Sequence, residues 1–140
     1  MNDSRMLWFI VEAGRRIEEH LENSLESTGL SLAKLNALKH LVEARSPLAL
    51  GQLAEKIECV KSNVTQLVDR LENDGLVRRL PDPNDRRSIL AAVTDLGRER
   101  YQAGADALAR AEGELLTALP ANQRDIVASV LSSIGARRAG

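Results

Sequence analysis

Residues 53–80, LAEKIECVKSNVTQLVDRLENDGLVRRL, followed by residues 81–94, PDPNDRRSILAAVT, form the stretch that decides the fold. Its apolar residues recur at the three- and four-residue steps of helices, first at Leu53, Ala54 and Ile57 and then at Val64, Leu67, Val68 and Leu71. This period predicts two helices, each with one apolar face. Residues 58–60 between them suffice only for a sharp turn. The pattern is that of a helix-turn-helix.

A β-hairpin is predicted directly after the second helix. Gly75 supplies the left-handed residue that ends the helix, and residues 76–80, LVRRL, are typical of a short edge strand. Pro81 and Pro83 exclude helix and central strand, because each fixes φ and lacks an amide donor. Residues 88–93, SILAAV, then form the return strand. A hairpin in this place is a wing.

The outward face of the second predicted helix carries the candidate DNA-contacting side chains. They are hydrogen-bonding groups without a carboxylate, namely Lys61, Ser62, Asn63, Thr65 and Gln66, with Arg70 one turn further on. Such groups suit base edges and phosphates, and we expect phosphate contacts from Lys61 and Arg70. The alternative is an ordinary solvated helix face. The wing favours DNA binding, since two further cations, Arg86 and Arg87, stand at the start of its return strand.

The run VTQLVDRLENDGLVRRLPDPNDRRSILAAVTDLG, residues 64–97, resembles the MarR (multiple antibiotic resistance regulator) family of bacterial winged-helix transcription factors. The resemblance rests on VDRLE at 68–72, GLV at 75–77, DPNDRR at 82–87 and the closing VTDLG at 93–97. It implies a sequence-specific transcription regulator, most simply a ligand-responsive repressor, that binds a pseudo-palindromic operator in double-stranded DNA as a homodimer. It also implies an effector pocket between the dimer helices and the DNA-binding lobe, which Trp8 and Phe9 could line, although such aromatic residues are more often core.

Several positions depart from the family pattern or admit two interpretations. Related proteins often carry Arg or Lys where this chain has Gln66, and Gln pairs best with adenine, so a preference for A·T is predicted there. They usually have Ser or Thr where Ala49 and Val60 stand. Gly51 and Ser62 could therefore begin the two helices later, with Ser62 as a cap. Arg87 is either a minor-groove contact or the partner of Asp85 in an ion pair, and Arg86 is a phosphate or groove contact.

Cys59 is the only cysteine of the chain, and it precedes the recognition helix. The positive end of a helix lowers the pKa of a nearby thiol, so Cys59 could act as a redox switch. The more ordinary interpretation is a small buried side chain. A single cysteine excludes an internal disulfide and is compatible with a cytoplasmic protein. The apolar run Leu7–Val11 is too short to span a membrane.

Composition narrows the possible functions. The chain has 140 residues, 44% of them apolar, and three aromatic residues, which favours a single, mainly α-helical domain with a small hairpin. A net charge of −1 excludes a protein that coats nucleic acid indiscriminately, and it leaves open a winged-helix module that binds protein instead of DNA. No phosphate loop, nucleophile–base pair or metal-ligand spacing is present. We therefore expect no enzyme, cofactor or metal.

Helices are also predicted on both sides of the winged helix-turn-helix. They cover residues 5–27, residues 32–44 with Ser31 as N-cap, residues 96–119 with Thr94 or Asp95 as N-cap, and residues 120–134. Residues 47–50 form a short extended piece that could be a third strand. The first and last helices carry apolar stripes that need a partner, which favours a dimer over the alternative that both stripes pack on their own chain. We assign residues 1–30 and 96–140 to dimerisation and residues 31–95 to the DNA-binding lobe.

Overall fold

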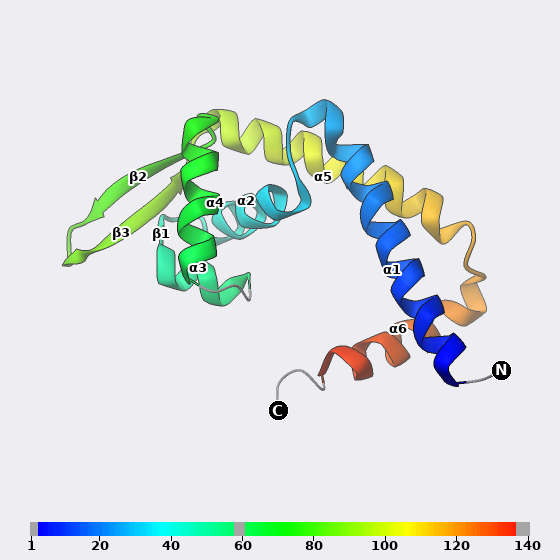
Figure 1. Cartoon of the computed structure of the whole chain (residues 1–140). Coiled ribbons are helices and arrows are strands. Elements are labelled where there is room, and N and C mark those ends of the chain that lie inside the picture. The colour runs from blue at the N-terminus through cyan, green and yellow to red at the C-terminus, as the bar shows by residue number, and fades with distance from the viewer. Residues whose placement is uncertain (1–2, 58–60, 137–140) are drawn as a thin grey trace.

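The computed structural model describes residues 3–57 and 61–136. Its elements, in chain order, are α1 Asp3–Leu25, the 3-10 helix η1 Glu26–Thr28, α2 Leu32–Ala44, β1 Leu48–Ala49, α3 Leu50–Lys56, α4 Lys61–Asn73, β2 Val77–Asp82, β3 Asp85–Val93, α5 Asp95–Leu116 and α6 Ala121–Ala136. Figure 1 shows α2, α3, α4 and the sheet gathered in one lobe, with α1 and α5 running away from it. The mainly helical fold with a hairpin wing is as the sequence predicts.

The sheet is antiparallel, with strand order β1-β3-β2. Leu48 pairs with Ala91 and Ala49 with Leu90, which confirms the predicted third strand. The hairpin is longer than expected, because β2 continues through Pro81 to Asp82, where the pairing becomes irregular. A proline is tolerated there because β2 lies at the edge of the sheet, where one side of the strand needs no donors.

Two side-chain caps fix where α2 and α5 begin. The Ser31 hydroxyl accepts a hydrogen bond from the Lys34 amide at 3.1 Å. The Thr94 hydroxyl accepts from the Gly97 amide at 3.0 Å and donates to the Gly75 carbonyl at 2.7 Å. Thr94 therefore joins the end of the recognition helix to the start of α5. The sequence allows Thr94 or Asp95 as the N-cap of α5, and in the structure the N-cap is Thr94.

The sequence allows two starts for α3, and the structure has the earlier one. The helix begins at Leu50 with Ala49 as N-cap, so the cap is not Gly51, two residues further along the chain. Pairing with β3 fixes Ala49 in extended conformation, so the chain enters the helix as soon as the pairing ends. The side-chain oxygen of Gln52 accepts from the Ala49 amide at 3.0 Å and satisfies one donor at this end of the helix.

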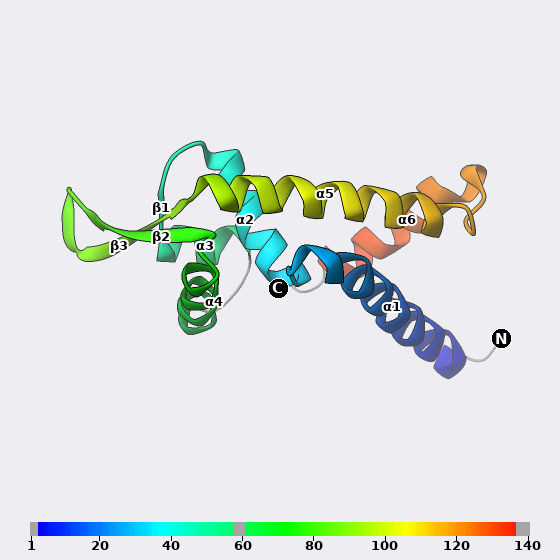
Figure 2. The ribbon, with the colours of Figure 1, turned by 90° about the horizontal axis from the view of Figure 1, so that it is seen from above.

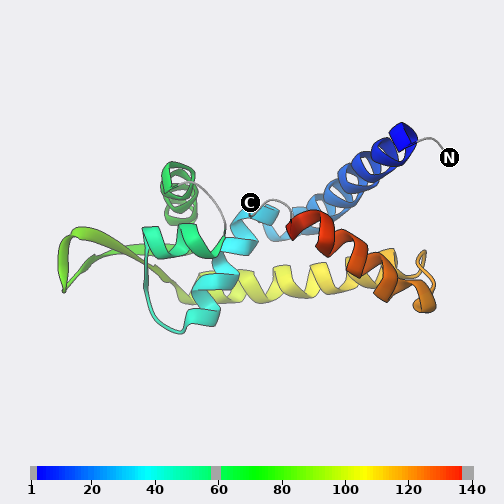
Figure 3. The same ribbon diagram turned by 90° about the horizontal axis from the view of Figure 1, so that it is seen from below.

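The hydrophobic core lies in the lobe and includes Leu25 at the end of α1. Its largest completely buried side chains are Leu25, Leu38, Leu41, Leu53, Val64, Val68, Leu71, Leu76 and Val77. By contrast, large apolar side chains of the outer helices are exposed, namely Met6, Leu7, Trp8, Phe9, Ile10, Val11 and Ile17 on α1 and Ile126, Val130, Leu131 and Ile134 on α6. Figures 1 and 3 show that α6 turns back from the far end of α5. The idea that both stripes are covered by their own chain is wrong.

On the outer part of α1, charged side chains pair along the helix. Glu12 binds Arg15 at 2.9 Å and Arg16 at 2.8 Å, and hydrogen bonds from Arg15 and then Arg16 lower the pKa of Glu12 to about 2.

Among residues 3–57 and 61–136, no helix is long and apolar enough to cross a membrane.

Candidate nucleic-acid interface

The recognition helix α4 is held on the lobe by one side and exposed on the other. Val64, Val68 and Leu71 are completely buried. The exposed side carries Asn63, Thr65, Gln66 and Arg70, which are amide, hydroxyl and guanidinium groups. The buried residues follow the helical period that the sequence shows, so the polar residues between them necessarily face outward.

The beginning of α4 is described only in part. Within the described residues α4 runs from Lys61, which places Ser62 inside the helix and not at its N-cap. The alternative start at Ser62 is therefore wrong. Cys59 and Val60 lie outside the described residues, so both predictions for Cys59 stay predictions.

An ion-pair network joins the wing to the recognition helix through Arg79 of β2. The Arg79 guanidinium donates to the Asp69 carboxylate, to Glu72 Oε1 at 3.2 Å and to the Thr65 carbonyl at 3.3 Å. Glu72 Oε2 also accepts from the Arg79 amide at 2.9 Å. The hydrogen bond to Asp69 raises the pKa of Arg79 above its ordinary range. The two carboxylates of α4 are thus neutralised by the wing.

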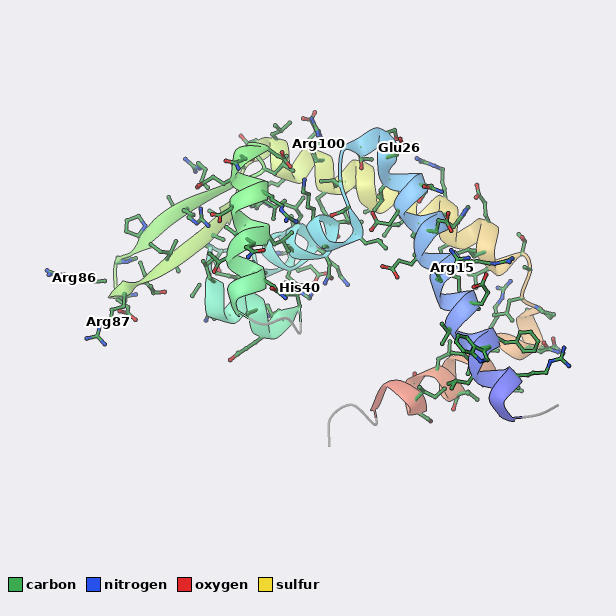
Figure 4. All side chains as sticks on the ribbon, viewed as in Figure 1. Arg15, Glu26, His40, Arg86, Arg87 and Arg100 are labelled. Carbon is green, nitrogen blue, oxygen red and sulfur yellow. The ribbon has the colours of Figure 1, made fainter. Side chains whose placement is uncertain are left out.

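The tip of the wing is shaped by two short side-chain-to-backbone hydrogen bonds. Asp82 Oδ1 accepts from the Asn84 amide at 2.9 Å, and Asp85 Oδ1 accepts from the Arg87 amide at 2.9 Å. Among the described residues, no ion pair joins the side chains of Asp85 and Arg87. Asp85 therefore shapes the loop through the backbone of Arg87. The side chains of Arg86 and Arg87 extend outward from the tip (Figure 4).

Arg79 is the functional residue that the sequence analysis missed. A signal was available, because Asp69 and Glu72 are three residues apart on one helix face and a strand rich in arginine follows directly. The period-two alternation of a strand shows that Arg78 and Arg79 point to opposite faces, but it does not show which of them faces α4.

A cavity of about 610 Å³ lies between α2 and α5. It is lined by Leu32, Ala33, Leu35, Asn36, Lys39, Tyr101, Ala105, Leu108, Ala109 and Glu112. Trp8 and Phe9 are not among these residues. They are 70% and 55% exposed on α1, so the interpretation of both as core residues of this chain is wrong. In the part of the chain that the structure describes, no group of three or more His, Cys, Asp or Glu could hold a metal ion.

The chain was compared with known proteins. A sequence model of the MarR family matches residues 30–89. The transcriptional regulator MhqR of Bacillus subtilis is 30% identical over 99 residues, which cover 69% of this chain and 68% of MhqR. The chain belongs to the MarR family. It spans little more than half the length of some curated relatives that it matches, 56% in two of them.

Solved structures of MarR-family proteins have the same fold over nearly the whole chain. AbsC, a MarR-family transcriptional regulator from Streptomyces coelicolor, superposes with a TM-score of 0.86 at 25% identity, over 100% of this chain and 97% of AbsC. A mutant MarR of Escherichia coli, complexed with operator DNA, superposes with a TM-score of 0.83 at 21% identity, over 93% of each chain.

Proposed function

We propose that this MarR-family chain is a sequence-specific DNA-binding transcription regulator. The observation that carries the proposal is the two-sided recognition helix, with Val64, Val68 and Leu71 completely buried and a polar face exposed next to a wing tipped by Arg86 and Arg87. A helix of this kind fits the major groove, and the wing can reach the flanking minor groove or phosphates. The likeness of fold to a MarR protein complexed with operator DNA supports it.

The proposed roles of the side chains follow from their chemistry. Asn63, Thr65 and Gln66 read base edges, because amides and hydroxyls can donate and accept hydrogen bonds. Arg70, Arg86 and Lys61 contact phosphates, which position the protein without selecting a sequence. Arg87 enters the minor groove, since its guanidinium is not used to shape the loop. Ser62, in the first turn of α4, contributes a further hydroxyl near the helix end.

The regulator acts as a homodimer in this proposal. Exposed apolar side chains on α1 and α6 form the kind of surface that a second copy covers. Two recognition helices related by a two-fold axis would enter successive major grooves about 34–36 Å apart, which is the spacing of a pseudo-palindrome.

The proposal also includes repression as the mode of regulation and a small-molecule effector as its control. A dimer on an operator represses when it excludes other proteins from the promoter. The cavity between α2 and α5 is the proposed effector site, because it joins the lobe to the long helix that leads to the dimer surface. A small molecule that binds better to a misspaced dimer shifts the population away from the DNA-binding state. Trp8 and Phe9 would line this site only if the partner copy brings them there.

The salt dependence of DNA binding tests the proposal. Duplexes selected from a random pool would be titrated by fluorescence anisotropy, and affinity should fall steeply with salt, by a slope of about 0.9 per phosphate contact. Arg86→Gln should reduce this slope by about one for each subunit. Arg110→Gln, which removes an exposed arginine from α5, should leave it unchanged. No selected duplex, or an affinity insensitive to salt, would rule out DNA binding and favour a protein partner.

A further inference from the structure

A second cavity, of about 230 Å³, lies where the end of α2, the wing strands and the start of α5 meet. It is lined by Leu41, Arg45, Ser46, Pro47, Arg78, Leu80, Ala92, Val93 and Arg98. Three of these nine residues are arginines and none is acidic. Residues from four elements thus bring positive charge to one small hollow, which neither the DNA interface nor the α2–α5 cavity uses.

The local structure explains how the three arginines converge. Arg45 ends α2 in the left-handed conformation, with φ at 57°. Arg78 precedes Arg79 on β2, so it points to the face of the sheet opposite to the one that Arg79 shares with α4. Arg98 lies in the first turn of α5. Segments far apart in the sequence therefore place three guanidinium groups around one cavity.

These guanidinium groups have no protein partner within the described ranges, 3–57 and 61–136. No ion pair or side-chain hydrogen bond involves Arg45, Arg78 or Arg98, whereas Arg15, Arg16 and Arg79 all pair with carboxylates. An acidic residue, Asp95, lines a neighbouring hollow together with Arg78, and no ion pair joins the two. All three arginines are exposed, so solvent screens part of the repulsion between their like charges, and an anion held between them would offset the rest.

The floor of the cavity is apolar. Leu41 is buried, and Leu80, Ala92 and Val93 are half-buried beside it. An occupant with a charged end and a short apolar part would match both regions. A volume of about 230 Å³ is below the range of drug-sized sites, which begins at about 300 Å³, so the occupant is small.

The position of the cavity argues against DNA as its occupant. Figures 2 and 3 show α4 against one face of the wing sheet, whereas α5 begins at the inner end of the sheet and runs away from the wing. The cavity lies on the face away from α4, near the start of α5, because Arg78 points away from α4 and Arg98 belongs to α5. A duplex in contact with α4 therefore approaches the opposite face of the sheet.

We propose that this cavity binds a small organic phosphate through Arg45, Arg78 and Arg98. A phosphate monoester carries close to two negative charges at neutral pH and has three terminal oxygens, so a single group can bind three guanidinium forks. Its ester substituent lies against Leu41 and Val93. This site needs no DNA, so it stands apart from the function proposed above.

Titration of the isotope-labelled chain with propyl phosphate tests the proposal. The amide signals of Ser46, Ala92 and Val93 should shift and reach saturation, and inorganic phosphate should produce the same shifts with weaker binding. Trimethyl phosphate, which is neutral, should produce none. Arg78→Gln combined with Arg98→Gln should weaken propyl phosphate binding at least about tenfold, since each charge-assisted hydrogen bond is lost. Arg110→Gln is the matched control and should bind as the natural chain does.

Four outcomes of the titrations with small molecules would overturn the proposal. They are the absence of saturable shifts in the natural chain, equal shifts with trimethyl phosphate, equal affinity in the double variant, and tighter binding of succinate than of propyl phosphate. Shifts of the same amides by a DNA duplex alone would identify the arginines as DNA contacts instead. The comparison of charged and neutral probes uses only the natural chain, so the test does not depend on the folding of a variant.

Discussion

Gln66 is the residue on which the proposed base preference depends most directly. It lies on the exposed side of α4, opposite the buried Val64 and Val68. Gln66→Arg should change the preference at one base pair in each half-site from A·T to G·C, because guanidinium pairs with guanine where an amide pairs with adenine. Such a change corresponds to about 1–3 kcal/mol of discrimination. Selection of duplexes with both proteins measures it.

The control for this change is Gln102→Arg, which adds the same charge on α5 and should leave base preference as it is. If Gln66→Arg alters only overall affinity and no position changes its preferred base, Gln66 does not read the operator.

Gly97 is a residue whose small size the packing requires. A Cβ there would lie 2.1 Å from the Leu76 carbonyl oxygen and 2.8 Å from Val93 Cγ2. Gly97→Ala should lower the free energy of unfolding by about 1–3 kcal/mol, because the backbone must move to admit the methyl group. A Cβ at Gly113, on the same helix, would meet nothing within 4 Å beyond the backbone of its own helix. Gly113→Ala should instead raise stability by about 0.5–1 kcal/mol.

Urea denaturation of the two variants measures the difference, and equal midpoints would contradict the close approach at Gly97. The pair also shows what sequence could predict at this scale. Ser31 and Thr94 are predictable as caps because capping is local chemistry. The glycines of α5 are predictable only as weak points in a helix, because the approach of Leu76 to Gly97 depends on tertiary packing.

Among the elements, the wing and the recognition helix behave as one unit through Arg79. Its side chain is 26% exposed and binds Asp69 and Glu72. Arg79→Gln should lower the free energy of unfolding by about 1–2 kcal/mol, with allowance for solvent screening of a partly exposed network. It should also weaken DNA binding without altering base preference, because the wing loses its fixed position relative to α4. Denaturation and anisotropy at two salt concentrations measure both effects.

Arg79→Lys keeps the charge but loses the guanidinium, whose two terminal nitrogens bind Glu72 and Asp69 separately, so its effects should lie between those of the natural chain and Arg79→Gln. A decrease of the salt slope in Arg79→Gln, like that expected for Arg86→Gln, would mean that Arg79 contacts phosphate and does not position the wing.

Element order was largely predictable because apolar period and turn residues are local signals. The two helices of the central stretch, the hairpin and the short strand at Leu48–Ala49 all follow from them. The continuation of β2 through Pro81 was not predictable, since it depends on β2 being an edge strand. Nor was the arginine cavity, because Arg45, Arg78 and Arg98 come from segments that only the topology brings together.

At the scale of the whole molecule, the chain divides its apolar side chains unevenly. The lobe buries most of its large apolar residues, although Ile89 of β3 is exposed, whereas α6 and the outer part of α1 leave theirs exposed. The stripes on these helices were visible in the sequence, but a stripe alone does not reveal whether its own chain covers it. In a single copy, the apolar side chains of α1 and α6 are exposed. A second copy is the simplest partner that would bury them.

The proposed dimer predicts the effect of charge on α6. Ile126 is 65% and Leu131 53% exposed in the single chain, so Ile126→Glu combined with Leu131→Glu should disturb the isolated fold little. Each full burial of such a side chain is worth about 1.5–3 kcal/mol, and burying an unpaired carboxylate costs more, so the variant should not associate. Sedimentation equilibrium should then give the mass of one chain, 15.3 kDa, and twice that mass for the natural protein.

The variant should also lose operator affinity, because one recognition helix reads only half of a pseudo-palindrome. Gln123→Glu adds negative charge on the same helix at an exposed polar position, so it should remain dimeric and bind as before. A natural protein with the mass of one chain would remove the dimer from the proposal. The two-sided recognition helix would then have to bind DNA as a single copy, with a half-site as its target and a correspondingly smaller dependence of affinity on salt.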